Sequence, residues 1–184
     1  RRRHGWSLIS LVGYTNAGKS TLLNGLTGAE VLADDKLFAT LDPTTRQLRL
    51  PNHQQVLLTD TVGFVRKLPH GLVEAFKATL EEVVEADLLI HVIDASHPLV
   101  EKQIEAVQQV LRELGAHEKP VVHVLNKSDL PETAAMAQVL SERLPACVVV
   151  SALKGTGLDH LRDALADQLR HRSVRLRLRI PHNQ

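Results

Sequence analysis

The residues best suited to chemistry form a short glycine-containing loop, GYTNAGKS, at positions 13–20. The loop follows an apolar run and precedes a helical pattern, so it matches the P-loop signature G-x-x-x-x-G-K-S in its usual context. There, glycines let backbone N–H groups face phosphate oxygens, and the helix N-terminus adds positive potential. Lys19 can reach the outer phosphates and the Ser20 hydroxyl can ligate Mg²⁺. We predict a phosphate site, since the full match disfavours an ordinary strand-to-helix turn.

A second motif, NKSD at 126–129, follows another apolar run and predicts which base is bound. The Asp129 carboxylate can accept from both the ring N–H and the exocyclic amine of guanine, whereas adenine offers no such pair of donors. Asn126 and the stem of Lys127 would hold the loop and cover the base. Backbone N–H groups of 151–153 would lie near the guanine oxygen. Alone, NKSD is a weak signal because these residues are common in turns, but its place after a P-loop strengthens it.

Between these motifs lies DTVG at 60–63, again at the end of an apolar run. Asp60 is positioned to hold Mg²⁺ through a water, and Gly63 to let a backbone N–H approach the terminal phosphate. The alternative for Asp60 is a turn or helix cap. All three motifs follow strand-like runs, where ligands of open α/β sheets bind. Together they predict a GTPase that uses GTP, GDP and Mg²⁺.

The segments that must position these motifs alternate between two patterns. Short apolar runs rich in β-branched residues predict buried strands at 8–13, 56–60, 88–94, 121–126 and 147–152. Helical spacing recurs between them, in Val73, Phe76, Leu80 and Val84, and in Leu158, Leu161, Leu165 and Leu169. The alternation predicts an α/β protein with a P-loop NTPase fold, a mostly parallel sheet and helices on both faces.

Three further segments are read from local pattern. The run at 47–50 is separated from 56–60 by a turn-like stretch, which predicts a hairpin and one antiparallel edge strand. Residues 28–45 lack periodicity and are expected to form a long functional loop. Residues 174–180 alternate apolar and Arg, which predicts a half-buried strand. Its arginines could pair with the phosphates of a nucleic acid or could simply be the solvated face of an edge strand.

Composition places limits on the class of protein. The 184 residues, 43% of them hydrophobic and 23% charged, suit a single globular domain. A net charge of +1 argues against a globally basic nucleic-acid binder. With a single Cys147, no signal-like segment and no run long enough to span a membrane, we expect a cytoplasmic location. His91 lies within an apolar run and is interpreted as a core residue rather than a metal ligand.

The chain resembles the guanine-nucleotide domain of HflX-type proteins over about residues 6 to 170. The resemblance rests on GYTNAGKSTLLNGLTG, LFATLDPTTR, DTVGFVRKLPHGLVEAFKATLEEV, ADLLIHVIDASHP and NKSDL, and LPHGLVEAFKATLEE is its most specific part. It implies a cytoplasmic GTPase that binds the large ribosomal subunit and splits stalled or idle ribosomes, often under stress. Full-length members also carry an N-terminal domain and a helical linker. We therefore expect a linker remnant at 1–6, the GTPase domain at 7–171 and a basic strand or linker at 172–184.

Two segments are expected to act as switches, at 33–45 and 63–72, ordered by Mg²⁺·GTP and released by hydrolysis. Thr40, Thr44 and Thr45 compete as the Mg²⁺ ligand. We assign Thr40, because it lies twenty residues after Ser20, roughly the spacing seen in small GTPases.

Two other positions bear on the rate of hydrolysis. Phe64 stands where many relatives have the Gln that orients the attacking water, and the resemblance includes this hydrophobic residue. It predicts slow intrinsic hydrolysis that a partner, another residue or a cation completes. Asn16 resembles the Asn that binds K⁺ in potassium-activated GTPases. The alternative is that Asn16 only stabilises the loop.

The expected site residues follow from these motifs. Catalysis is assigned to Lys19, Thr40 and Gly63; metal binding to Ser20, Thr40 and, through a water, Asp60, with Asn16 for K⁺. Nucleotide contacts are expected from Gly13, Tyr14, Thr15, Asn16, Ala17, Gly18, Lys19, Ser20, Thr21, Phe38, Ala39, Thr40, Leu41, Asp42, Asp60, Thr61, Val62, Gly63, Asn126, Lys127, Asp129, Ser151, Ala152 and Leu153.

Two rival functions remain. A guanine-nucleotide-dependent binding module with incidental hydrolysis is compatible with Phe64. An ATP-using P-loop protein is disfavoured by Asp129. The isolated domain is expected to be a monomer without a membrane anchor.

Overall fold

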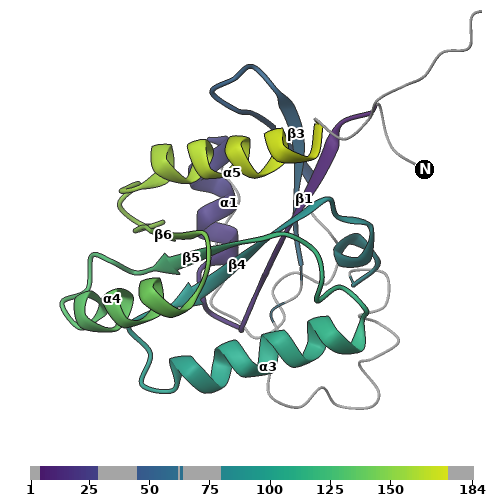
Figure 1. Cartoon of the computed structure of the whole chain (residues 1–184). Helices are drawn as coiled ribbons and strands as arrows, with labels where there is room; N and C mark the ends of the chain where they lie inside the picture. Colours follow the sequence, from purple (N-terminus) through teal and green to yellow (C-terminus); the bar gives the residue numbers. More distant parts are fainter. Residues whose placement is uncertain (1–4, 29–44, 62, 64–79, 174–184) are drawn as a thin grey trace, which may run out of the picture.

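A computed structural model describes residues 5–28, 45–61, 63 and 80–173. The described part is built on one six-stranded sheet with the order β2-β3-β1-β4-β5-β6 (Figure 1). The strands are β1 (Ser7–Gly13), β2 (Thr45–Arg49), β3 (Gln55–Asp60), β4 (Leu88–Asp94), β5 (Val121–Asn126) and β6 (Cys147–Val149). All neighbouring pairs are parallel except β2 with β3, which are antiparallel.

The sheet carries helices on both faces, in agreement with the predicted α/β class. The named helices are α1 (Lys19–Thr27), α3 (Val100–Glu113), α4 (Thr133–Arg143) and α5 (Leu158–Ser173), and residues 80–85 are also helical. Helices α1 and α5 pack together on one face, while α3, α4 and residues 80–85 cover the other (Figure 1). The result is a three-layer arrangement.

The central strands are apolar on both sides because both faces are covered. Leu88 and Ile90 of β4 join the core beneath α1 and α5, whereas Leu89 joins the core beneath α3. All seven residues of β4 are buried. This is why the sequence shows continuous apolar runs here rather than alternation of apolar and polar residues. Because β1, β3 and β5 run in the same direction, they end at the same edge of the sheet, and each predicted motif begins at the last residue of one of them.

Most expected elements are confirmed, with local differences. The hairpin of β2 and β3 is present, and Thr45, expected in the long loop, is the first residue of β2. The expected strand at 147–152 ends at Val149, and Ser151 makes only an isolated bridge to Thr156. In the helical residues 80–85, Val83 is fully buried while Val84 is 46% exposed, so the apolar face includes Val83 in place of Val84.

Other expectations fall elsewhere in the chain. The basic segment 174–180 and most of the loop 28–45 lie outside the described residues. None of the helices in the described part has the length and apolar character that crossing a bilayer would require.

Candidate functional site

The predicted phosphate loop joins β1 to α1 in a turn shaped by its glycines. Gly13 must lack a side chain, because a Cβ there would lie 2.6 Å from the Val92 carbonyl oxygen on the neighbouring strand. Gly18 has a φ of 102° and caps α1, and a Cβ there would collide with the Asn126 amide nitrogen. The first turn of α1, all of it described, contains no acidic residue. The positive potential of the helix N-terminus is therefore left for an anion.

Lys19 is the first residue of α1 and is only 7% exposed. Burial lowers the pKa of its ammonium group, and the nearby Asp60 carboxylate opposes this shift. Burying a cation costs free energy in the folded protein, so this position is poor for stability alone. A buried ammonium beside a helix N-terminus is well suited to meet a polyphosphate.

The expected Mg²⁺ ligands Ser20 and Asp60 meet directly. The Ser20 hydroxyl donates to the Asp60 carboxylate over 2.9 Å. Hydroxyl and carboxylate oxygens are the donors that Mg²⁺ prefers, so this pair fits the ion chemically. Gly63 lies against the P-loop, since a Cβ on it would be 2.9 Å from the Thr15 Cα. Thr61 makes a contact within the fold instead. It is fully buried, and its hydroxyl donates to the Leu11 carbonyl at 2.7 Å, which joins the residue after β3 to β1.

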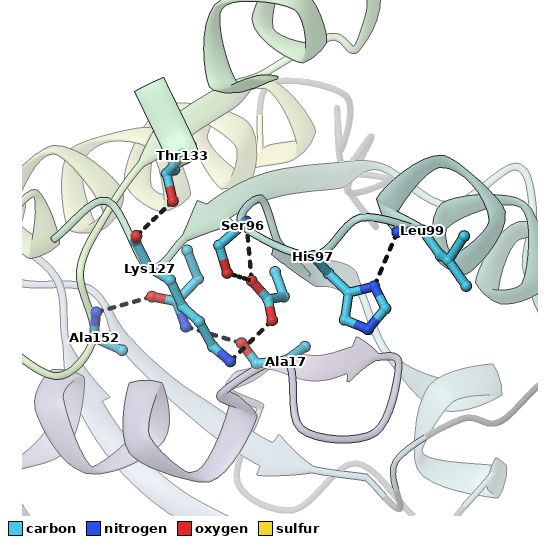
Figure 2. Close-up of polar contacts among 9 residues, drawn as sticks. Ala17, Ser96, His97, Leu99, Lys127, Thr133 and Ala152 are labelled. Carbon is cyan, nitrogen blue, oxygen red and sulfur yellow. Dashed lines mark hydrogen bonds and ion pairs between the residues drawn. The ribbon is translucent and has the colours of Figure 1, made fainter. Parts of the chain in front are cut away.

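Asn126 connects the two ends of the site. Its amide nitrogen donates to the Ala17 carbonyl in the P-loop over 2.9 Å, and its amide oxygen accepts from the Ala152 N–H over 2.9 Å (Figure 2). These partners lie 109 and 26 residues away in the sequence. One buried side chain thus fixes the P-loop and the 151–153 segment relative to each other.

Asp129, the residue predicted to recognise the base, is exposed but anchored. One of its carboxylate oxygens accepts from the Ser151 hydroxyl over 2.8 Å, and Ser151 itself is buried. The same hydroxyl accepts from the Lys154 N–H. Ala152 is buried beside Ser151, whereas Leu153 is 73% exposed. The carboxylate is therefore oriented in advance, with an exposed side available to a ligand.

Asp94 and Ser96 extend this constellation and were not singled out from the sequence. Asp94 ends β4 and pairs in register with Asn126, which ends β5. Its carboxylate accepts from the Ser96 N–H at 3.0 Å and hydroxyl at 2.6 Å, and it forms an ion pair of 2.9 Å with Lys127 (Figure 2). Burial acts to raise the pKa of Asp94, but the hydrogen bonds from Ser96 and Lys127 outweigh it and hold the pKa below its ordinary value. The available signal was the position of Asp94 at a strand end.

The other expected site residues lie in varied settings. Asn16 is exposed and has a φ of 62°, a conformation that Asn tolerates better than most residues. Its two alternative roles, K⁺ binding and loop stabilisation, both stay predictions. Tyr14 packs against the core beneath α3, and Thr21 lies half-buried in α1. Residues 38–42, Val62 and Phe64 lie outside the described residues.

No group of three or more His, Cys, Asp or Glu suited to a metal ion is found among the described residues. His91 is buried in β4 with its ring centroid 5.6 Å from that of His123, in agreement with a core role. Burial of His91, with a smaller contribution from His123, lowers its pKa to about 3.

Comparison with known proteins gives a consistent result. The family model described as 50S ribosome-binding GTPase matches residues 8–127. A protein named GTPase HflX from Caldanaerobacter subterraneus is 52% identical over 169 residues, which is 92% of this chain and 38% of that protein. GTPase HflX from Escherichia coli is 49% identical over 174 residues, covering 94% of this chain and 41% of its own length. The chain thus spans about two fifths of these relatives.

Solved structures with the same arrangement include two nucleotide complexes. A GTP-binding protein from Sulfolobus solfataricus in complex with GDP superposes with a TM-score of 0.71 at 34% identity, covering 90% of this chain and 53% of that one. A variant of Era from Aquifex aeolicus bound to GDP and aluminium fluoride has a TM-score of 0.74 at 26% identity, covering 96% and 57%.

Proposed function

Because the chain belongs to the 50S ribosome-binding GTPase family and is of the HflX type, we propose that this domain binds GTP with Mg²⁺ and hydrolyses it to GDP and phosphate. The proposal rests on the Asn126 side chain, which makes two hydrogen bonds. It joins the P-loop at Ala17 to the 151–153 segment at Ala152, and so sets a phosphate-binding end and a base-binding end at a fixed separation.

At the phosphate end, the backbone N–H groups of the P-loop and the N-terminus of α1 bind the phosphates. The Lys19 ammonium neutralises the outer phosphates. Ser20 and Thr40 ligate Mg²⁺, and Asp60 holds it through a water. The residues present fit this metal, since Ser20 and Asp60 are already in hydrogen-bond contact. When bound, Mg²⁺ supplies charge neutralisation on the terminal phosphates.

At the base end, the Asp129 carboxylate accepts two N–H bonds from guanine and excludes adenine. Ser151 keeps this carboxylate oriented, and the Lys127 stem covers the base. The backbone at Ala152 and Leu153 lies near the guanine oxygen. The exposure of Asp129 together with its anchor to Ser151 supports this division of roles.

Catalysis would be mainly positioning and charge stabilisation by Lys19 and by backbone donors around Gly63. Phe64 cannot polarise water through a side-chain amide, so intrinsic turnover is slow. The missing contribution comes from a partner, from another residue or from K⁺ near Asn16. The binding energy of a partner would then control when GTP is hydrolysed to GDP and phosphate.

Family membership supports a proposal for the biological role. We propose that the domain acts as a cytoplasmic switch that associates with the large ribosomal subunit and promotes splitting or rescue of ribosomes under stress. GTP orders 33–45 and 63–72, and hydrolysis releases them. The domain boundaries at residues 7–171 belong to the same proposal. For the basic 172–184 segment, contact with ribosomal RNA and the solvated face of an edge strand both stay predictions.

A second candidate is a guanine-nucleotide-dependent binding module with incidental hydrolysis, which Phe64 favours. A non-hydrolysable GTP analogue distinguishes the two. The module predicts that the analogue supports a complete cycle of subunit binding and release. The switch predicts arrest in the bound state.

The experiment that tests the proposal is GTP turnover in potassium buffer with Mg²⁺, with and without purified large ribosomal subunits. We expect slow turnover alone and strong stimulation by the subunit. Turnover that the subunit leaves unchanged would contradict ribosome recognition by this domain. Absence of any GTP hydrolysis under both conditions would contradict the enzymatic function itself.

A further inference from the structure

The ion pair of Asp94 and Lys127 lies between the base-binding end and the phosphate-binding end of the proposed site. Asp94 ends β4 and Lys127 follows β5, and the register places Asp94 beside Asn126. Figure 2 shows the Lys127 side chain running from the start of the NKSD loop toward Ala17 of the P-loop, with its ammonium at the Asp94 carboxylate. The side chain therefore crosses the region between the base-binding and phosphate-binding ends.

Both ends of Lys127 are held. Its backbone has a φ of 67°, and its carbonyl accepts from the Thr133 hydroxyl at 2.7 Å. Its ammonium is 2.9 Å from the Asp94 carboxylate. The other oxygen of that carboxylate accepts two bonds from Ser96, so the anchor itself has little freedom to turn. A long flexible side chain is in this way confined to one path.

The pair is better suited to ordering Lys127 than to stabilising the fold. The Lys127 side chain is 33% exposed, and ion pairs with a solvated partner contribute little to folding. Ordering is more valuable for a ligand, because a lysine that is already immobile does not lose its rotamer freedom when the ligand binds. The carboxylate of Asp94 is 10% exposed and cannot itself reach far into solvent.

We propose that Asp94 is a positioning residue for guanine-nucleotide binding, which holds the Lys127 stem in the path it takes over the bound base, with Ser96 fixing Asp94 in turn. The inference rests on the proposed function, since it requires a nucleotide at the site. It assigns no catalytic step to Asp94. Its consequence is that the end of β4, outside the sequence motifs, controls how long the nucleotide stays bound.

The test compares two aspartates at opposite ends of the same strand. Asp94→Asn removes the charge that holds Lys127. Asp87→Asn is the matched control, because Asp87 precedes β4 at its other end and accepts from the Leu8 N–H at 2.9 Å. Dissociation of a fluorescent GDP is measured by stopped flow, and binding of GDP and of inorganic pyrophosphate by calorimetry. Both variants are compared with the unchanged chain below the onset of unfolding.

We expect Asp94→Asn to accelerate GDP dissociation roughly three- to tenfold. This factor corresponds to the entropy cost of immobilising one lysine side chain when the nucleotide binds. Pyrophosphate binding should stay unchanged, because it occupies only the phosphate end. Asp87→Asn should leave both unchanged. In a Lys127→Met background, Asp94→Asn should add nothing further, since it acts through Lys127. Asp94→Glu should restore part of the slow dissociation.

Three results would overturn the proposal. One is an unchanged GDP dissociation rate in Asp94→Asn. Another is an equal loss of GDP and pyrophosphate binding, which would indicate general disruption of the site. The third is slower dissociation, which would mean that the released ammonium binds the nucleotide better than the anchored one.

Two checks separate this proposal from other failures. If Asp94→Asn does not fold, Ser96→Ala removes one of the two Ser96 bonds to the anchor, and it should accelerate GDP dissociation roughly twofold; no acceleration would count against the anchor. Failure of the unchanged chain to bind GDP at all would overturn the proposed function and the positioning role together. Normal binding by the unchanged chain with no effect in the variants overturns only the positioning role.

Discussion

The phosphate end and the base end of this site are built by different means. The phosphate end depends on backbone: Gly13 and Gly18 lie where a Cβ would strike a neighbour, and the helix N-terminus provides the potential. The base end depends on side chains that bond to one another, as Ser151 does to Asp129 and Lys127 to Asp94.

The difference indicates where each end is vulnerable. At the phosphate end, adding an atom is more damaging than removing one, with Lys19 as the exception. At the base end, removing a side chain releases the group that it orients. Asn126 belongs to both ends, because it bonds to the Ala17 carbonyl and to the Ala152 N–H.

Lys19→Met should have the largest effect on activity and almost none on the fold. Removing the ammonium should lower GTP turnover by roughly 100-fold or more, because it removes charge stabilisation at the phosphates. Since burial already lowers the pKa of Lys19, an apolar side chain of similar length should leave the melting temperature equal or higher. Turnover and thermal unfolding measured on the same sample check both halves. Turnover near that of the unchanged chain would contradict the role of Lys19.

Gly18→Ala should damage both ends at once. The new Cβ would collide with the Asn126 amide at a residue whose φ is 102°, at a cost of about 1–3 kcal/mol in the free energy of unfolding. GDP affinity should fall as well. The matched control is Gly115→Ala, where φ is 70° but nothing lies within 4 Å. It should show strain of about 1–2 kcal/mol and unchanged GDP affinity. Equal GDP affinities in Gly18→Ala and Gly115→Ala would contradict the idea that a collision with Asn126 weakens nucleotide binding.

Ser151→Ala should act on the base end alone. Asp129 loses the hydroxyl that orients it, so GDP affinity should fall by about 1 kcal/mol, roughly fivefold. The preference for GDP over ADP should narrow, while pyrophosphate binding should not change. Calorimetric titrations with the three ligands measure this directly. A drop in pyrophosphate binding as large as the drop in GDP binding would show that the two ends are not separable.

Lowering the pH should destabilise the whole fold, and with it both ends of the site. Near neutral pH this is the smallest of the expected effects. The pKa of His91 is about 3 in the fold, against an ordinary value of about 6.5 in the unfolded chain, so the unfolded chain binds the extra proton. Stability is therefore fully present above about pH 6.5 and is lost as the pH falls toward 3, by about 1.4 kcal/mol per pH unit from this group. His123, whose pKa burial also lowers, adds to the loss.

The measurement for this effect is the free energy of unfolding in urea between pH 7 and pH 4. His91→Leu should flatten the pH dependence, whereas His117→Leu, at an exposed position, should not. An identical slope in His91→Leu and the unchanged chain would rule out His91 as the source.

Local motifs explain why much of the site could be predicted from the sequence. The P-loop is a contiguous segment whose chemistry depends on its own glycines, and Asn126 and Asp129 belong to another. The apolar runs predicted the central strands because both faces of the sheet are covered. The relation of Asn126 to Ala17 follows only from the order of the strands, which places β1 beside β4 and β4 beside β5.

Other features depend on register or phase, which sequence patterns define poorly. Asp94 gains its place in the site from pairing with Asn126 across two strands. Val83 replaces Val84 on the buried face because a change of one residue rotates a helical position by about 100°. Strand β6 is short because the chain leaves the sheet after Val149 to bring Ser151 and Ala152 to Asp129 and Asn126.

We propose that the two ends hold one guanine nucleotide between them. Calorimetric titration of the unchanged chain with GDP and with ADP, in the presence of Mg²⁺ and K⁺, tests this arrangement. The account predicts tight binding of one GDP per chain and much weaker binding of ADP, because only guanine offers two donors to Asp129. Equal affinity for the two nucleotides would contradict it.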